Sequence, residues 1–399
     1  MVGGTVTSRY RRDLNFLSRV GYKPLVKIYS EILVRAIVAS ATGPYHASRR
    51  PSKQIRHRKR LQAMNIVAMV LAGGEGTRLH PLTAENAKPA VPFASGYRLV
   101  DFVLSNLVNS RISTIYVLAQ YKPESLLKHI STAWAPWFAD GEGTIKALLP
   151  RSNTLGGQFK GTADAVYQYL DLLQAHSPDL VAVFAADHVY RMDVRQMVAF
   201  HRERRADVTV SAVGVPLAQA SHFGVVVTGA DGRISEFKEK PKCAPAMPTD
   251  PTRAYASMGN YLFDPDVLQR ALIEARRRGD TDFGRDVLPR LCTTHNVYAY
   301  DFANNRIPGL QDHEEPAYWR DVGTLTALAA AQQDAMGNQP RFNLWNRRWP
   351  IRGEFDAALL ARIRGWREQA MAEVDAPLSG PAWQGANRDR RSDERLQPS

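Results

Sequence analysis

The sequence predicts an α/β fold in which a mostly parallel, twisted sheet carries helices on both faces. Apolar segments of strand length alternate with amphipathic helical segments from residue 64 onward. Such alternation is typical of a parallel sheet covered by helices. In addition, the first strand, 66–71, runs into a glycine-rich turn. Ligands of these sheets bind beyond the carboxyl ends of the strands, so that turn is the first place to look for a site.

Hydrophobic periodicity assigns the elements in chain order. After the first strand, Leu99, Phe102, Val103 and Leu107 indicate a helix. The further expected strands are 114–119, 180–186, 208–215, 224–228, 233–238, 255–263 and 296–302. The further expected helices are 123–133, 162–174, 193–205, 265–278, 283–292 and 324–336. A polar loop is expected over 136–160, and loops of that length are usually functional or disordered.

Charge and composition divide the chain into three parts. Residues 1–63 carry fourteen Lys and Arg against two acids, so twelve of the thirteen net positive charges lie there. We expect a basic, poorly ordered extension at 1–63 with an amphipathic helix, a catalytic domain at 64–352, and a C-terminal helix with a disordered tail at 353–399. For 1–63, a disordered leader or translated sequence upstream of Met64 is favoured over a targeting or membrane-surface segment.

The composition also argues against several classes of protein. No apolar stretch is long and uncharged enough to span a bilayer. The two cysteines, Cys243 and Cys292, lie far apart, which indicates a reduced compartment without a disulfide framework and predicts a cytoplasmic protein. Because the body beyond residue 63 is nearly neutral, we expect no nucleic-acid partner.

The stretch Ile66–Leu79 has the outline of a phosphate site. An apolar strand ends in Gly73, Gly74 and Gly76, and Arg78 follows. Glycine lets backbone N–H groups approach an anion closely and form a concave nest. The spacing matches neither a P-loop nor the dinucleotide fingerprint. Taken alone, the stretch is equally compatible with an ordinary strand-to-helix turn.

Four further residues are candidates for phosphate and metal chemistry. Asp187, directly after a buried strand, and Asp321 are carboxylates suited to Mg²⁺, although an Asp that caps the next turn is an alternative. Lys88 and Lys240 are point charges suited to phosphate, although the alternating charges around Lys240 are also typical of a solvated edge. His188 is a candidate base, which a lone histidine supports only weakly.

These residues belong to longer strings that carry a family resemblance. Leu71–Leu79 together with Lys88-Pro89-Ala90 resembles the signature of sugar nucleotidyltransferases. Further strings, in order and spacing, resemble bacterial glucose-1-phosphate adenylyltransferases, or ADP-glucose pyrophosphorylases. They include Gly161–Ala165, Ala186–Tyr190, Glu239–Pro241, Tyr318–Thr324 and Trp349–Arg352. The resemblance covers about 64–352. It implies a Rossmann-like nucleotidyltransferase domain that makes ADP-glucose and pyrophosphate from ATP and glucose 1-phosphate, for glycogen synthesis.

The resemblance implies a role for each matched residue. The ATP phosphate loop would be Leu71, Ala72, Gly73, Gly74, Gly76 and Thr77. The catalytic residues would be Arg78, Lys88 and Asp187, with Arg78 and Lys88 on the leaving pyrophosphate. Asp187 and Asp321 would hold Mg²⁺. Glucose 1-phosphate would bind Tyr121, Gly224, Glu239, Lys240 and Ser257. No general base is required, because the attacking phosphate is already ionised at neutral pH.

The sequence departs from this family after Arg352. Relatives continue into a left-handed β-helix that contributes to assembly and regulation, and 353–399 contains no recognisable hexapeptide repeat. A homo-oligomer is compatible with the sequence, but the family's usual tetramer and effector control are not predicted by it. Two alternatives to the enzyme remain: a related transferase that uses UTP, dTTP or GTP, and a non-catalytic regulatory subunit. A natural truncation and a frameshifted reading frame are both compatible with the C-terminus.

Overall fold

The computed structural model describes residues 64–354 apart from 95, 140, 142 and 152–156. The expected basic extension, the expected C-terminal helix and tail, and the expected absence of a β-helix therefore lie outside the described residues. Within the described ranges, no helix combines the length and apolar character needed to cross a membrane.

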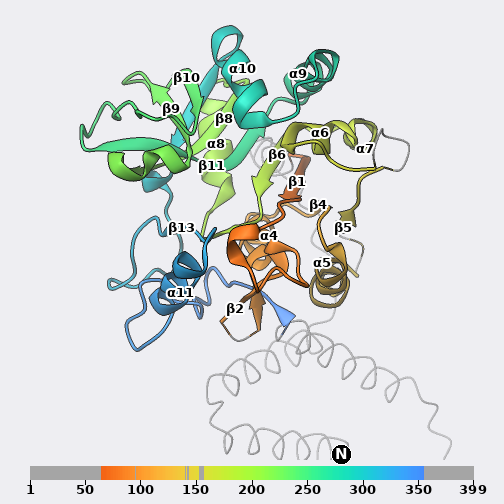
Figure 1. The fold of residues 1–399 in the computed structure, drawn as a ribbon, viewed down its shortest axis with the longest axis vertical. Helices are drawn as coiled ribbons and strands as arrows, with labels where there is room; N and C mark the ends of the chain where they lie inside the picture. The colour runs from red at the N-terminus through yellow and green to blue at the C-terminus, as the bar shows by residue number, and fades with distance from the viewer. Residues whose placement is uncertain (1–63, 95, 140, 142, 152–156, 355–399) are drawn as a thin grey trace, which may run out of the picture. The chain divides into compact units, whose positions relative to one another are not determined.

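Strand β1 (Ile66–Ala72) lies inside a nine-stranded sheet. It is parallel to β4 (Thr114–Ala119) and β6 (Leu180–Ala185), and β4 is parallel to β5 (Thr144–Leu148). Beyond β6, the long strand β11 (Arg253–Phe263) runs antiparallel to β6, β8 and β9. The predicted α/β class is confirmed, and the sheet is parallel around β1, at the middle of Figure 1.

The other predicted elements appear in the predicted order. The other strands are β2 (Pro92–Phe93), β3 (Tyr97–Arg98), β7 (His188–Tyr190), β8 (Val208–Pro216), β9 (Gly224–Thr228), β10 (Ile234–Glu239), β12 (Val297–Asp301) and β13 (Trp319–Asp321). The short strands β2, β3, β7 and β13 are additional to the predicted elements. The α-helices are α4 (Leu99–Asn109), α5 (Pro123–His129), α6 (Thr162–Tyr167), α7 (Leu170–His176), α8 (Val194–Glu203), α9 (Pro265–Arg278), α10 (Leu288–Thr294) and α11 (Leu325–Asp334). Two short 3-10 turns, η1 (Thr77–Leu79) and η2 (Lys88–Ala90), follow β1.

Alternate residues of β1 face two separate hydrophobic cores. Ala68 and Val70 pack with residues of α4, α5 and α8. Val67 and Met69 pack with residues of α6, α7, α9 and α10. Successive side chains of a strand point to opposite faces of the sheet, so helices cover both faces, as the sequence predicts. With both faces covered, the ends of the strands are the places left for a ligand.

A third, smaller core holds β13 in place. Phe93 of β2, Phe102 of α4, Val322 beside β13 and Leu328 of α11 are all buried in it. Figure 1 shows β13 and α11 to the left of α4, and β2 below it. Strand β13 pairs only with β7 among the described strands, and the two form a separate small sheet. The third core therefore fixes the segment that ends at Asp321.

The structure corrects two predictions about elements. Strand β5 lies inside the segment predicted as the loop 136–160, and its partly exposed residues at the edge of the sheet give little apolar periodicity. The single helix predicted for 162–174 is divided into α6 and α7. At the break, the buried Gln168 side chain donates to the Gln158 carbonyl and to Asp164 Oδ2, contacts that a one-dimensional pattern does not contain.

Candidate active site

The glycine loop follows β1 at its carboxyl end, and two of its glycines have different environments. Gly76 has a φ of 69°, and a Cβ there would lie 2.9 Å from Lys88 Cβ. Both its conformation and its packing therefore require glycine. Gly74 has no heavy atom within 4 Å of the place a Cβ would occupy. Its backbone is open to an approaching ligand.

Arg78 extends from this loop toward the segment after β13. The side chain is exposed, and its Nη2 atom lies 3.0 Å from the place a Cβ would occupy at Gly323. The same place is 3.1 Å from Asp321 Oδ1. Gly323 thus leaves room for the guanidinium beside the Asp321 carboxylate. The sequence motif contains this glycine, but only the fold shows what it accommodates.

Lys88, Asp187, His188 and Asp321 form one group of side chains, which we call the carboxylate cluster. Lys88 Nζ donates to Asp187 Oδ2 at 2.9 Å and lies 3.9 Å from Asp321 Oδ1. Strands β7 and β13 pair antiparallel with His188 opposite Asp321. One potential ligand atom from each of Asp187, His188 and Asp321 lies within 4.8 Å of the others. The fold therefore brings together the two carboxylates that the sequence left far apart.

The charges within the carboxylate cluster keep Asp187 ionised. Burial by itself would raise the pKa of the Asp187 carboxyl, but the charges of His188 and Lys88 outweigh it and hold that pKa well below its usual range. The Asp187 side chain remains 34% exposed, against 10% for Lys88, so solvent weakens the attraction between them. The result is a negative pair of carboxylates beside a nearly buried ammonium.

Gly224, Glu239 and Lys240 lie where β9 pairs with the end of β10, and Ser257 lies on the neighbouring strand β11; we call these four residues the strand-end cluster. Gly224 opens β9 opposite Glu239, the last residue of β10. A Cβ at Gly224 would lie 2.7 Å from a Phe237 ring atom and 3.0 Å from Glu239 Oε2. Glycine at this position therefore leaves room for the Glu239 carboxylate.

Lys240 is the most exposed member of the strand-end cluster. It adopts a φ of 45°, its N–H donates to the Phe223 carbonyl, and its side chain is 64% exposed. Its ammonium lies 3.3 Å from Glu239 Oε1. Ser257 stands on β11 at a register shift, where its Oγ accepts from the Gly259 N–H at 3.2 Å. Tyr121 follows β4 and is 37% exposed.

Trp319 lies between the two clusters, and the sequence pattern predicted no role for it. Its ring centroid lies 5.0 Å from that of His188 and 5.5 Å from that of Phe223, the neighbour of Gly224. Gly284 is a second residue without a predicted role. A Cβ there would lie 2.8 Å from Glu239 Oε2, so glycine leaves room for that carboxylate. The signal for Trp319 was its place next to Arg320 and Asp321 in the matched string. No local signal marks Gly284.

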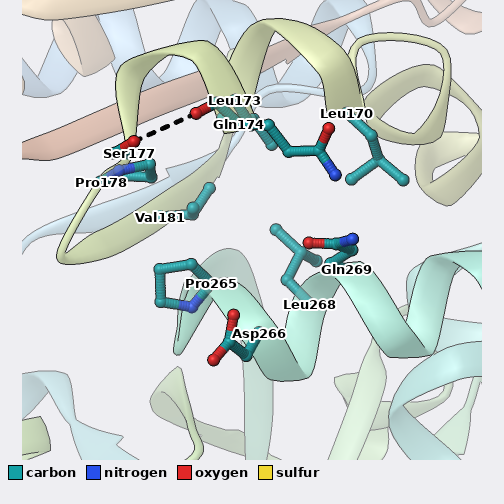
Figure 2. Close-up of a pocket in the computed structure, with 10 residues that line it drawn as sticks. All are labelled: Leu170, Leu173, Gln174, Ser177, Pro178, Val181, Pro265, Asp266, Leu268 and Gln269. Carbon is teal, nitrogen blue, oxygen red and sulfur yellow. Dashed lines mark hydrogen bonds between the residues drawn. The ribbon is translucent and has the colours of Figure 1, made fainter.

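Two cavities of the described surface differ in what lines them. The larger, of about 850 Å³, has Arg78, Trp319 and Asp321 among the residues that line it. The smaller, of about 330 Å³, lies between α7 and α9 and is shown in Figure 2. Among the described residues that line the smaller cavity there is no basic side chain, and Leu170, Leu173 and Leu268 contribute apolar surface. The larger cavity is therefore the one that adjoins the candidate site.

Comparison with known proteins agrees with this geometry. Residues 67–337 match the family model described as nucleotidyl transferase. The chain belongs to the nucleotidyl transferase family. The matched range contains both the carboxylate cluster and the strand-end cluster, and transfer of a nucleotidyl group is the reaction class of this enzyme.

Several curated relatives share one name. A glucose-1-phosphate adenylyltransferase of Thermodesulfovibrio yellowstonii is 50% identical over 289 residues, which cover 72% of this chain and 70% of that protein. The enzyme of the same name from Mycobacterium ulcerans is 49% identical over 300 residues, or 73% of this chain and 72% of that one. That of Anaeromyxobacter dehalogenans is 48% identical over 292 residues, or 72% and 70%.

Proposed function

We propose that this chain transfers the adenylyl group of ATP to glucose 1-phosphate, forming ADP-glucose and pyrophosphate for glycogen (α-glucan) synthesis. The shared name of the relatives supports the choice of substrates. The observation that carries the proposal is the convergence of Lys88, Asp187 and Asp321 next to the glycine loop. Both substrates are phosphate anions, and such a transfer depends on bringing them together and neutralising their charge.

The donor atoms of the carboxylate cluster fit Mg²⁺. Asp187 and Asp321 offer the carboxylate oxygens that this hard cation prefers, and their ligand atoms lie close together. His188 Nδ1 faces the same place and is buried without a hydrogen-bond partner among the described residues. When bound, Mg²⁺ would neutralise phosphate charge and act as a template for the two substrates. Asp187 and Asp321 are the residues that we assign to hold it.

The chain's own groups account for the rest of the transfer. The backbone amides of Gly73 and of the exposed Gly74 would receive the triphosphate, with Arg78 placed to bind the leaving pyrophosphate. A phosphate oxygen of glucose 1-phosphate forms the new bond to the α-phosphorus while the bond to pyrophosphate breaks. Pyrophosphate leaves with the electron pair of that bond. No proton has to move, so the site requires no general base.

The strand-end cluster supplies groups suited to a sugar phosphate. The ammonium of Lys240 is exposed beside Glu239 and would pair with the phosphate, and the Glu239 carboxylate can accept hydrogen bonds from sugar hydroxyls. We assign Ser257, Gly224 and Tyr121 to the same ligand. Both cysteines are free, as expected for the reducing cytoplasm in which we place the reaction.

One assay tests the proposal. The purified chain is incubated with Mg²⁺, glucose 1-phosphate and, in separate reactions, ATP, UTP, dTTP or GTP, and released pyrophosphate is measured. We expect ATP to give by far the highest kcat/KM. A preference for another triphosphate would indicate a related transferase. No release by folded protein would favour the non-catalytic subunit. Measuring the mass in solution in parallel gives the oligomeric state.

A further inference from the structure

His188 has an unexplained buried nitrogen. Its side chain is 12% exposed, and Nδ1 is inaccessible to solvent without a hydrogen-bond partner among the described residues. The nearest acidic atom, Asp187 Oδ1, lies 3.5 Å away, too far for a good hydrogen bond. Leaving a buried polar atom unpaired costs free energy, so such an atom in a native structure indicates a ligand or another role.

The backbone holds this nitrogen at the carboxylates. His188 opens β7 directly opposite Asp321, and it follows Asp187 in the chain. Residues opposite each other in an antiparallel pair carry their side chains on the same face. The ring is packed at 5.0 Å from the Trp319 ring, with a tilt of 44°. Its orientation is therefore set by packing rather than by solvent.

The spacing suits a shared cation. Two ligand atoms at about 2.1 Å from one metal ion lie at most about 4.2 Å apart. Asp187 Oδ1 and His188 Nδ1, at 3.5 Å, already satisfy this limit. Lys88 bonds the other carboxylate oxygen, Oδ2. A metal ion could therefore bind Asp187 Oδ1, the oxygen that faces His188, and leave the bond between Lys88 and Oδ2 in place.

We propose that His188 binds the divalent cation through Nδ1, as a third protein ligand beside Asp187 and Asp321. The inference rests on the proposed function, which assigns the cation to the two carboxylates alone. The cation would replace the charge of His188 beside Asp187, because an imidazole binds a metal in its neutral form, with its proton on Nε2 and a lone pair at Nδ1. This role also explains why a histidine is present at a site whose reaction requires no base.

Mn²⁺ serves as the probe, because it substitutes for Mg²⁺ and is paramagnetic. Full-length protein is labelled with ¹⁵N only at histidine, and pulsed electron paramagnetic resonance is recorded with Mn²⁺ and pyrophosphate, which contains no nitrogen. We expect a ¹⁵N coupling of the size given by a directly bound imidazole. His188→Phe keeps an aromatic ring against Trp319 but has no ring nitrogen, and it should abolish the coupling. It should also raise the Kd for Mn²⁺ at least about tenfold, since even partners of metal ligands contribute about 10–100-fold.

His222→Phe is the matched control. His222 lines the cavity beside Asp321 but is not among the grouped ligand atoms, so the coupling and the Kd should be unchanged. Stoichiometric Mn²⁺ binding without ¹⁵N coupling in the wild type would overturn the role of His188 and leave the two-carboxylate site standing. Persistence of the coupling in His188→Phe would also overturn it. Absence of Mn²⁺ binding would reject both metal assignments, while the pyrophosphate assay tests the transfer reaction separately.

Discussion

The carboxylate cluster and the strand-end cluster both contain a lysine beside a carboxylate, but they differ in burial. Lys88 is 10% exposed and bonds Asp187 at 2.9 Å. Lys240 is 64% exposed and lies 3.3 Å from Glu239. An exposed ion pair contributes little to stability, whereas the loss of one partner from a buried pair leaves a charge uncompensated.

The difference in burial corresponds to two kinds of anion site, one formed in advance and one ordered by its ligand. The carboxylate cluster lies between two small strands and a separate core, so its geometry is fixed before any ligand arrives. The strand-end cluster stands at the edge of the sheet, where a ligand has to order the exposed side chain. Changes in the first cluster should therefore affect chemistry and stability together. Changes in the second should affect substrate affinity alone.

The largest effect is expected at Asp187. Asp187→Asn removes one of the two charges assigned to Mg²⁺ and leaves Lys88 without its closest carboxylate. We expect Mg²⁺-dependent pyrophosphate release to fall at least about a thousandfold, because charge stabilisation is the main contribution to such transfers. The Tm should also fall, while circular dichroism should still report a folded protein.

Asp171→Asn is the control for this change. Asp171 also forms an ion pair, with Arg151 at 2.7 Å, but it is 65% exposed and lies on α7. Its loss should leave turnover and Tm nearly unchanged. Near-normal turnover of Asp187→Asn would rule out the metal assignment.

The two glycines of the phosphate loop provide the next largest effect. Gly76→Ala forces a side chain into a φ of 69° and against Lys88 Cβ, and should destabilise the protein by about 1–3 kcal/mol. Gly74→Ala meets no protein atom within 4 Å, so its Tm should equal that of the wild type. Its kcat/KM for ATP should nevertheless fall about a hundredfold, because the methyl group would displace the triphosphate. Full activity of Gly74→Ala would place the phosphates elsewhere.

Lys240→Gln tests the strand-end cluster. The loss of a charge-assisted contact should raise the KM for glucose 1-phosphate about 10–100-fold with little change in kcat or Tm. Lys238→Gln is a matched control two residues earlier, on β10, since Lys238 is 42% exposed and pairs with Glu236. Steady-state kinetics with each substrate varied in turn gives both constants. An effect confined to the KM for ATP would contradict the assigned role.

The smallest effect is expected from deletion of 1–63. Both clusters are formed by residues within 64–354, so the kinetic constants of the shortened protein should match those of the full chain. Loss of activity in a soluble, folded protein would mean that the extension contributes to the site.

The sequence predicted most elements because the apolar periodicity that indicates a helix or a strand lies within the element's own residues. The strand 114–119 and the helix 265–278 have the same bounds in the structure as in the sequence pattern. Strands β7 and β13 were not predicted. Each has three residues, and they form because segments more than 120 residues apart pair with each other. The residues of a short segment do not show which distant segment it will pair with.

By itself, the sequence determined the fold class, the glycine loop after the first strand, and the identity of the charged residues, because these depend on local pattern and composition. Only the tertiary structure decided which of those charges meet. Pairing of β7 with β13 brings Asp321 to His188 and Asp187, and packing of η2 brings in Lys88. The physical reason is that burial and distance, which set the strength of an electrostatic interaction, exist only once distant segments have packed together.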